Sequence, residues 1–253
     1  MTVKLYAMTC GWLTMRLGSM LVGEEGMIKV PVPCYLIDHP KGKVLFDSGM
    51  NKASISEPDD YLGPMAKFFS LHFNAGEELQ KRLELLQVAP GDITHLVNSH
   101  LHFDHAGGND QVTKAPVIVQ RPEWEAATAS DIDPISGYLK RDYDIGQDVK
   151  KIDGEHDIFG DGSVVCIPTP GHTPGHQSLR VRLAGGDVVL SGDACYLRRT
   201  LEEMRLPIIL HDKDQMLDSL KKLRELQSRG ARIFYGHDPE FWESVPQAPA
   251  EVV

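Results

Sequence analysis

Apolar and polar residues alternate along this chain in short blocks, and the blocks predict strands and helices in turn. Two β-rich runs, 32–38 ("VPCYLID") and 43–49 ("KVLFDSG"), flank a "HPKGK" segment that is typical of a hairpin turn. Later β-rich runs end in turns that contain glycine, histidine or aspartate. These further strands are predicted at 92–99, 115–120, twice within 163–183, at 186–197 and at 231–238.

Apolar residues at helical spacing predict three helices between these strands, at 76–88, 121–129 and 213–229. In the last of them Met216, Leu220, Leu223 and Leu226 fall on one face, and Gly230 is a plausible C-terminal cap. Residues 51–75 lack clean alternation, and we interpret them as a long excursion with one short helix around 65–73.

The alternation of strands and helices predicts an α/β protein whose sheets are covered by helices, with the chemistry at one rim of the sheets. The 253 residues are enough for one large α/β domain or two small ones. No repeat or low-complexity tract divides the chain.

Composition narrows the functional classes. The hydrophobic fraction of 42% and the charged fraction of 25% are ordinary for a globular protein. A formal net charge of −10 argues against a nucleic-acid partner, which requires a basic surface. No apolar run approaches 18 residues, so we expect no membrane span. The first residues lack the features of a signal peptide, and the four scattered cysteines fit reduced thiols, so a cytoplasmic protein is expected.

The candidate chemistry begins with "SHLHFDHAGGN" at 99–109, which holds His100, His102, Asp104 and His105 within six residues. On an extended segment, His100 and His102 point to the same side. Imidazole and carboxylate suit zinc and related first-row ions, and a catalytic ion needs about three protein ligands with one position left open. We therefore expect two cations, each of which requires further ligands from elsewhere in the chain.

Three strand-end residues complete such a set: His172 in "TPGHTPGH", Asp193 in "SGDACY" and His237 in "FYGHD". We assign His100, His102 and His172 to one ion, and Asp104, His105 and His237 to the other, with Asp193 as a bridging carboxylate. Asp47 in "LFDSG" has two readings that remain open: it orients a metal-bound histidine, or it only forms a turn. We expect His176 to play a structural or supporting role.

At these motifs the chain resembles the metallo-β-lactamase superfamily and, within it, the N-acyl-homoserine lactonases, which quench quorum-sensing signals. The resemblance covers nearly the whole chain and includes "PGHTPGHQS" and "VIVQRPEWEAA". It implies one domain over 1–253 with an αβ/βα sandwich of two mixed β-sheets flanked by helices. It also implies two divalent metal ions, with zinc expected, and a small-molecule lactone substrate. Because dimers occur among the proteins that it resembles, a homodimer is expected by analogy.

The chemistry that the resemblance implies is opening of the lactone ring by a hydroxide held between two metal ions. Tyr196 would stabilise the developing oxyanion, and Asp104 would carry the proton to the leaving oxygen. We expect apolar side chains near the site to hold the acyl tail. The candidates are Tyr61, Met65, Phe68, Phe69 and Phe73 of the excursion, which would cap the site, and Met8, Trp12, Leu13 and Met15 near the N-terminus.

Rival functions share this metal motif. A hydrolase of other small lactones, of the γ-butyrolactone type, remains open. A thioester hydrolase of the glyoxalase II type is less favoured, because the basic C-terminal segment that binds glutathione is not apparent. A non-catalytic metal-stabilised binding module is also disfavoured, since a closed structural site uses four ligands, and seven candidates are present.

Overall fold

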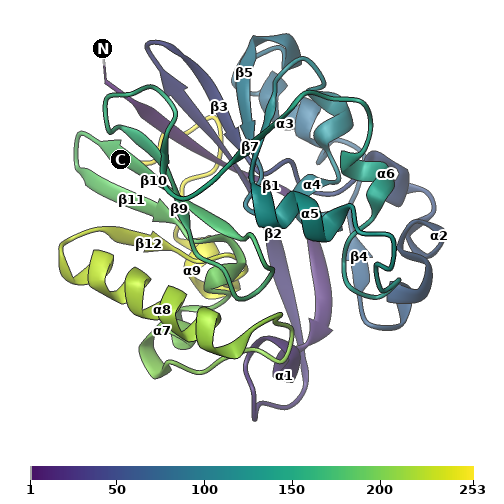
Figure 1. The fold of residues 1–253 in the computed structure, drawn as a ribbon. Coiled ribbons are helices and arrows are strands. Elements are labelled where there is room, and N and C mark those ends of the chain that lie inside the picture. Colours follow the sequence, from purple (N-terminus) through teal and green to yellow (C-terminus); the bar gives the residue numbers. More distant parts are fainter. Residues whose placement is uncertain (1) are drawn as a thin grey trace.

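The computed structural model describes residues 2–253 and has two mixed β-sheets packed face to face with helices outside (Figure 1). The first sheet has seven strands in the order β4-β1-β2-β3-β5-β6-β7, and the second has five in the order β12-β11-β10-β9-β8. This arrangement confirms the predicted αβ/βα sandwich. The strands are β1 (Lys4–Arg16), β2 (Met27–His39), β3 (Gly42–Phe46), β4 (Ser70–His72), β5 (Ile93–Val97), β6 (Val117–Gln120), β7 (Val149–Ile152), β8 (His156–Asp157), β9 (Val164–Pro168), β10 (Gln177–Leu183), β11 (Gly186–Leu190) and β12 (Arg232–Phe234).

The helices cover the outer faces of the two sheets. Leu79 and Leu83 of α3 pack on the seven-stranded sheet, and Leu220 and Leu223 of α8 pack on the five-stranded sheet. The α-helices are α1 (Leu17–Met20), α2 (Pro58–Leu62), α3 (Leu79–Glu84), α4 (Phe103–Ala106), α5 (Arg121–Ala127), α6 (Lys140–Tyr143), α7 (Arg198–Glu203), α8 (Lys213–Ser228) and α9 (Pro239–Glu243). Short 3-10 helices are η1 (Lys52–Ile55), η2 (Gly63–Lys67), η3 (Pro90–Asp92), η4 (Asn109–Gln111) and η5 (Gly192–Ala194).

The main core lies between the two sheets, where inward-facing side chains of both interdigitate. Phe46 and Val97 of the first sheet meet Leu179, Val188 and Phe234 of the second, and all five are buried. Burial of this much apolar surface is the main driving force that holds the two sheets together. Among residues 2–253, none of the helices combines the length and the apolar content that are needed to cross a bilayer.

Strand β1 is the largest element that the apolar pattern does not reveal. It pairs antiparallel with β2 over nearly its whole length, but the register shifts between Thr9 and Trp12. Gly11 lies within this irregularity at φ 100°, a conformation that residues with a side chain rarely adopt. The bulge interrupts the two-residue alternation by which a strand is recognised.

The excursion at 51–75 differs from the prediction of one helix around 65–73. It holds η1, α2 and η2 in succession and ends in β4, which pairs with β1 through Trp12 and His72. The helical turns therefore lie earlier than predicted, and the last part is an edge strand. Because each of these elements is only three to five residues long, no helical or strand periodicity develops in the sequence.

Candidate metal centre

The seven predicted ligands come from loops that follow four strands at one rim of the sandwich. His100 and His102 follow β5, and the helix α4 presents Asp104 and His105 one turn later. His172 lies in the turn after β9, while Asp193 in η5 follows β11 and His237 follows β12. The structure thus brings together residues that are up to 137 positions apart.

Three imidazole nitrogens converge in one half of the site. The Nε2 atom of His172 lies 3.2 Å from Nε2 of His100 and 3.1 Å from Nδ1 of His102. All three side chains are buried. Tetrahedral zinc with bonds of about 2.0–2.1 Å to nitrogen places its ligand atoms about 3.3 Å apart, so this spacing fits an ion of that size.

The second half of the site combines one carboxylate with two imidazoles. Oδ2 of Asp104 lies 3.7 Å from Nε2 of His105 and 3.7 Å from Nε2 of His237. These ligand atoms lie within 4.8 Å of one another. The group has the mixed oxygen and nitrogen character that first-row divalent ions accept.

Asp193 faces both halves, one oxygen to each. Its Oδ2 lies 3.3 Å from His172 Nε2 and 3.8 Å from His100 Nε2. Its Oδ1 lies 3.3 Å from His105 Nε2 and 3.1 Å from His237 Nε2. A carboxylate in this position can bridge two cations, which is the role that the sequence predicts for it.

The donor atoms themselves fit a pair of divalent metal ions. His105 Nε2 and Asp193 Oδ1 are buried and have no hydrogen-bond partner. A buried polar atom without a partner is destabilising, and a cation at this position satisfies both atoms. The converging nitrogen atoms of His100, His102 and His172 offer lone pairs to a single point when the outer ring nitrogens carry the protons.

Four of the five imidazoles use their outer nitrogen to hold the ring in place, and Nδ1 of His100 lies 3.0 Å from the hydroxyl oxygen of Ser99. Nδ1–H of His237 donates to the carbonyl of Pro31 at 2.7 Å, and that of His105 donates to Asp47 Oδ2 at 2.9 Å. Nδ1 of His172 lies 3.2 Å from the carbonyl of Ile209. A proton on the outer nitrogen leaves the Nε2 lone pair free for a metal ion, as in most metal-bound histidines.

Asp47 therefore supports the site through His105 and also forms a turn. Its second contact is to Ser99, whose backbone N–H donates to Oδ1 at 2.7 Å and whose hydroxyl donates to Oδ2 at 2.8 Å. The backbone of Asp47 has φ 56°, which is uncommon outside glycine, asparagine and aspartate. The two readings that the sequence leaves open are both present in the structure.

Burial and neighbouring charges shift the pKa values of the histidines in opposite directions in the two halves of the site. Burial lowers the pKa of His100 and His102 well below the ordinary value, and neighbouring imidazoles lower it further, so both rings are neutral. Burial also acts to lower the pKa of His105 and His237, but the carboxylates of Asp193 and Asp104 outweigh it and raise both. The carboxylates thus create a negative potential that favours a bound positive charge.

His176 has the supporting role that the sequence predicts. Its Nε2 accepts a hydrogen bond of 3.0 Å from the backbone N–H of Asp193, and its Nδ1 lies 3.1 Å from the carbonyl of Thr169. Burial lowers the pKa of His176 to about 3, so the ring stays neutral and can accept from Asp193.

The hydroxyl of Tyr196 lies at the edge of the metal ligands. It is 3.0 Å from Nδ1 of His172, whose proton can be shared between this oxygen and the carbonyl of Ile209. Burial, together with the charges of Asp193 and Asp104, raises the pKa of Tyr196 well above its ordinary value. The phenol is therefore protonated, and its own hydrogen is available to a substrate oxygen.

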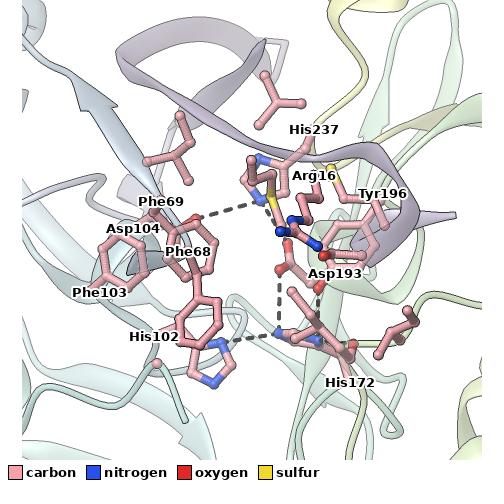
Figure 2. A pocket seen from close by; sticks show the side chains of 18 of the residues that line it. Arg16, Phe68, Phe69, His102, Phe103, Asp104, His172, Asp193, Tyr196 and His237 are labelled. Carbon is pink, nitrogen blue, oxygen red and sulfur yellow. Dashed lines mark hydrogen bonds and ion pairs between the residues drawn. The ribbon is translucent and has the colours of Figure 1, made fainter. Parts of the chain in front are cut away.

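A cavity of about 610 Å³ opens above these ligands, and this volume is in the range of small-molecule sites. Figure 2 shows His102, Asp104, His172, Asp193, Tyr196 and His237 gathered around it. Phe68 and Phe69 from the excursion and Leu13 and Met15 from β1 line its walls, as predicted. The other lining residues are Arg16, Ser19, Met20, Met27, Val30, Lys67, Phe103, Ile135, Ser136, Gly137, Ile208 and Ile209.

Five of the predicted tail-binding residues do not line this cavity. Tyr61, Met65 and Phe73 are buried in the core cluster beneath the excursion, and Met8 of β1 is buried in the core cluster that also holds Leu79 and Leu83 of α3. Trp12 packs against the core between the sheets. Apolar character predicts burial but does not distinguish a core side chain from one that faces a cavity.

Sequence reasoning also missed residues that shape the site. Gly137 has φ 97°, and a Cβ atom there would lie 2.8 Å from the ring of His102. Tyr138 packs its ring edge-on against His102 with the centroids 4.8 Å apart. Both lie in a loop without periodicity, where the sequence carries no signal beyond one glycine.

An αβ/βα sandwich with two adjoining groups of buried metal ligands beneath an open cavity defines a class of metal-dependent hydrolases. The family model described as the metallo-beta-lactamase superfamily matches residues 27–237. The chain belongs to this superfamily and, as curated relatives 34% identical to it show, to the family of the N-acyl homoserine lactonases within it.

The curated relative named N-acyl homoserine lactonase AttM, from Azorhizobium caulinodans, is 34% identical, and the alignment covers 98% of this chain and 97% of the relative. N-acyl homoserine lactonase AiiA from Bacillus thuringiensis subsp. kurstaki is 34% identical over 85% and 84% of the two chains. A solved N-acyl homoserine lactone hydrolase with the product N-hexanoyl-L-homoserine bound at its catalytic metal centre aligns over 100% of both chains with a TM-score of 0.90 and 32% identity.

Proposed function

We propose that this protein hydrolyses the lactone ring of N-acyl-homoserine lactones, and so quenches quorum-sensing signals, with two Zn²⁺ ions per chain. His100, His102 and His172 would hold one ion, and Asp104, His105 and His237 the other. Asp193 would bridge the two. The relatives that bear this name, and the solved relative with a ring-opened product at its metal centre, support the assignment.

One observation carries the proposal: the two oxygens of Asp193 face two separate groups of buried ligands at the floor of a cavity with largely apolar walls. A closed structural zinc site needs only four ligands and no cavity. The walls suit an acyl tail, and the polar floor suits a lactone ring.

The ions, when bound, supply Lewis-acid polarisation of the ester carbonyl and a water nucleophile of lowered pKa. Tyr196 faces the same cavity with a protonated hydroxyl, which would donate to the carbonyl oxygen as negative charge develops there. The carboxylate of Asp104 also lines the cavity. It would accept the proton of the attacking water and pass it to the ring oxygen that leaves. The product is the ring-opened N-acyl homoserine.

The substrate class is tested by pH-stat titration of the zinc-loaded protein against a panel of esters. We expect acid release from N-acyl-homoserine lactones of several tail lengths, and much slower release from γ-butyrolactone, a glutathione thioester and a β-lactam. Preferred turnover of γ-butyrolactone or of the thioester would overturn the proposal in favour of that rival. Metal analysis of the same sample should give two ions per chain.

The excursion supplies part of the cavity wall through Phe68 and Phe69, and we propose that it holds the acyl tail. Phe69 is half-buried and packs edge-on against Phe103 at 5.5 Å between ring centroids. Phe69→Ala should raise KM several-fold for a ten-carbon tail and leave KM for a four-carbon tail nearly unchanged. Phe73→Ala is unsuitable as a control because Phe73 is buried in the core; Leu85→Ala, on an exposed site outside the cavity, is the matched control. An equal effect on both tails would contradict this role.

We also propose that the protein is cytoplasmic and forms a homodimer. The four cysteines are free and buried, which agrees with a reducing compartment. Fractionation of the native cells and light scattering of the purified protein test these two predictions directly.

A further inference from the structure

Glu123 is a buried carboxylate that the proposed chemistry does not use. It lies in α5, outside the cavity, and its side chain has no exposed surface. A charged group buried so completely requires compensating hydrogen bonds, because its desolvation is costly. Burial raises the pKa of Glu123, whereas each of the groups that donate to it acts to lower it.

Four donors surround this carboxylate, and three of them come from the two loops that carry His100, His102 and His172. Oε1 accepts from the backbone N–H of Leu101, between His100 and His102, at 3.0 Å. Oε2 accepts from the hydroxyl of Thr173, next to His172, at 2.6 Å and from the backbone N–H of Gly175 at 3.1 Å. One side chain therefore joins the loop after β5 to the turn after β9.

The fourth donor is Tyr138, which lies in a different loop and also contacts one of these histidines. The hydroxyl of Tyr138 donates to Glu123 Oε1 at 3.0 Å, and the ring of Tyr138 packs against His102. The backbone is equally confined, since a Cβ atom at Gly175 would lie 2.1 Å from the backbone nitrogen of Glu123. Close packing of the turn against α5 leaves Glu123 little freedom to move.

We infer that Glu123 is a positioning residue for the metal ion held by His100, His102 and His172, acting by fixing the two loops that present these ligands. None of the four donors belongs to the group formed by Asp104, His105 and His237. Asp104 and His105 continue the loop after β5, but His105 is held separately by Asp47, so loss of the Glu123 carboxylate should weaken the ion on His100, His102 and His172 and largely spare the other. The inference rests on the two-ion site of the proposed function but not on its substrate.

The test is metal binding by Glu123→Gln, measured by competition with a chromophoric chelator and by metal analysis. Glutamine has the same shape, but its NH₂ group cannot accept a hydrogen bond from the N–H groups of Leu101 or Gly175. Replacement of a residue that supports metal ligands from outside typically costs about 10–100-fold in metal affinity. We expect a loss of that size for one of the two ions, with the other bound as in the wild type.

Two further variants keep the result interpretable. Tyr138→Phe removes one donor and retains the ring on His102, so it should weaken the same ion by a smaller factor. Glu125→Gln changes an exposed carboxylate of the same helix and should bind both ions normally. If Glu123→Gln folds poorly, Tyr138→Phe still decides the question.

Normal affinity for both ions in Glu123→Gln, or equal weakening of both, would overturn the inference, and so would normal affinity in Tyr138→Phe. A protein that binds two ions in this pattern but opens no lactone would overturn the proposed function alone. The readout does not require turnover, so the two failures are distinguishable.

Discussion

Individual side chains around the metal ligands differ in whether they would touch the substrate or only hold a ligand in place. Tyr196 and Asp104 line the cavity, so they can contact reacting atoms. Asp47 and Glu123 do not line it and act through other residues. Substitutions in the two groups should therefore separate turnover from metal binding.

Tyr196→Phe removes a single hydroxyl that faces the cavity. Because that hydroxyl would stabilise charge mainly in the transition state, kcat should fall by roughly 100-fold with little change in KM. Metal content should stay at the wild-type value, since Tyr196 is not one of the seven proposed ligands and its hydroxyl lies at the outer nitrogen of His172. Steady-state kinetics and metal analysis of one sample measure both. Unchanged kcat would show that Tyr196 is only a satisfied interior tyrosine.

Asp47→Asn tests whether the hydrogen bond to His105 matters beyond the turn. Asparagine tolerates the left-handed backbone at this position, so the turn is retained. The neutral amide is a weaker acceptor for Nδ1–H of His105, and the affinity for the ion on Asp104, His105 and His237 should fall about 10-fold. Chelator competition measures it. Wild-type affinity would leave Asp47 a turn residue only.

At the scale of elements, one buried contact fastens the excursion to the rest of the fold. Tyr61 of α2 donates to Asp142 of α6 at 2.6 Å, and the Asn51 side chain donates to the other oxygen at 3.3 Å. Arg141 also lies over the Tyr61 ring, 4.9 Å from its centroid. These contacts hold the short helices that lie under Phe68 and Phe69.

Asp142→Asn should change how stability depends on pH. Burial raises the pKa of Asp142 to about 7 in the folded chain, against an unfolded value near 4. Folding therefore favours the neutral carboxyl. Its contribution to the free energy of unfolding is complete below pH 4 and is lost as the pH rises through 7. Asp142→Asn is neutral at every pH. Its free energy of unfolding should therefore rise, relative to that of the wild type, by about 2–4 kcal/mol between pH 4 and 8, which corresponds to roughly 4–16 °C in Tm.

Thermal melts at several pH values measure that difference. Asp144→Asn is a matched control, because Asp144 is about half exposed and pairs only with Lys140. The Tm difference between Asp144→Asn and the wild type should not rise between pH 4 and 8. Parallel curves for the wild type and Asp142→Asn would contradict the argument.

The sequence predicts an element well where apolar residues recur at regular spacing, and poorly where they do not. Helix α8 and its Gly230 cap follow from leucines at helical spacing on one buried face. Strand β1 was missed because the bulge at Gly11 breaks its alternation. The order of the short elements in the excursion depends on contacts such as Tyr61 to Asp142, which join positions 81 residues apart.

At the scale of the whole molecule, the sandwich fold determines where chemistry can occur. Strands β5, β9, β11 and β12 belong to two different sheets, yet the loops after them meet at one rim. The predicted ligands could be selected from sequence because four of them lie within a stretch of six residues after a strand, and the other three each follow a strand and a glycine. Glu123 could not, because its partners are backbone N–H groups and hydroxyls whose positions only the packed chain defines.

Metal ions bound at this rim would help to hold the two sheets in register there. Without ions, the carboxylates of Asp104 and Asp193 and five imidazoles stay buried together, and atoms such as His105 Nε2 have no hydrogen bond. An ion present at about 1,000 times its dissociation constant stabilises the folded state by about 4 kcal/mol, which for a chain of this size is roughly 8–16 °C in Tm. Removal of metal by a chelator should lower Tm by at least that amount.

Differential scanning calorimetry before and after chelation measures the loss, and metal analysis confirms the depletion. Zn²⁺ should restore the original Tm. Mg²⁺ at the same ionic strength should not, because it prefers six oxygen ligands and binds imidazole poorly. A depleted protein that melts at the original temperature would mean that the rim is held by packing alone. Asp193 Oδ1 and His105 Nε2 argue against that outcome, because both are buried and packing gives neither of them a hydrogen bond.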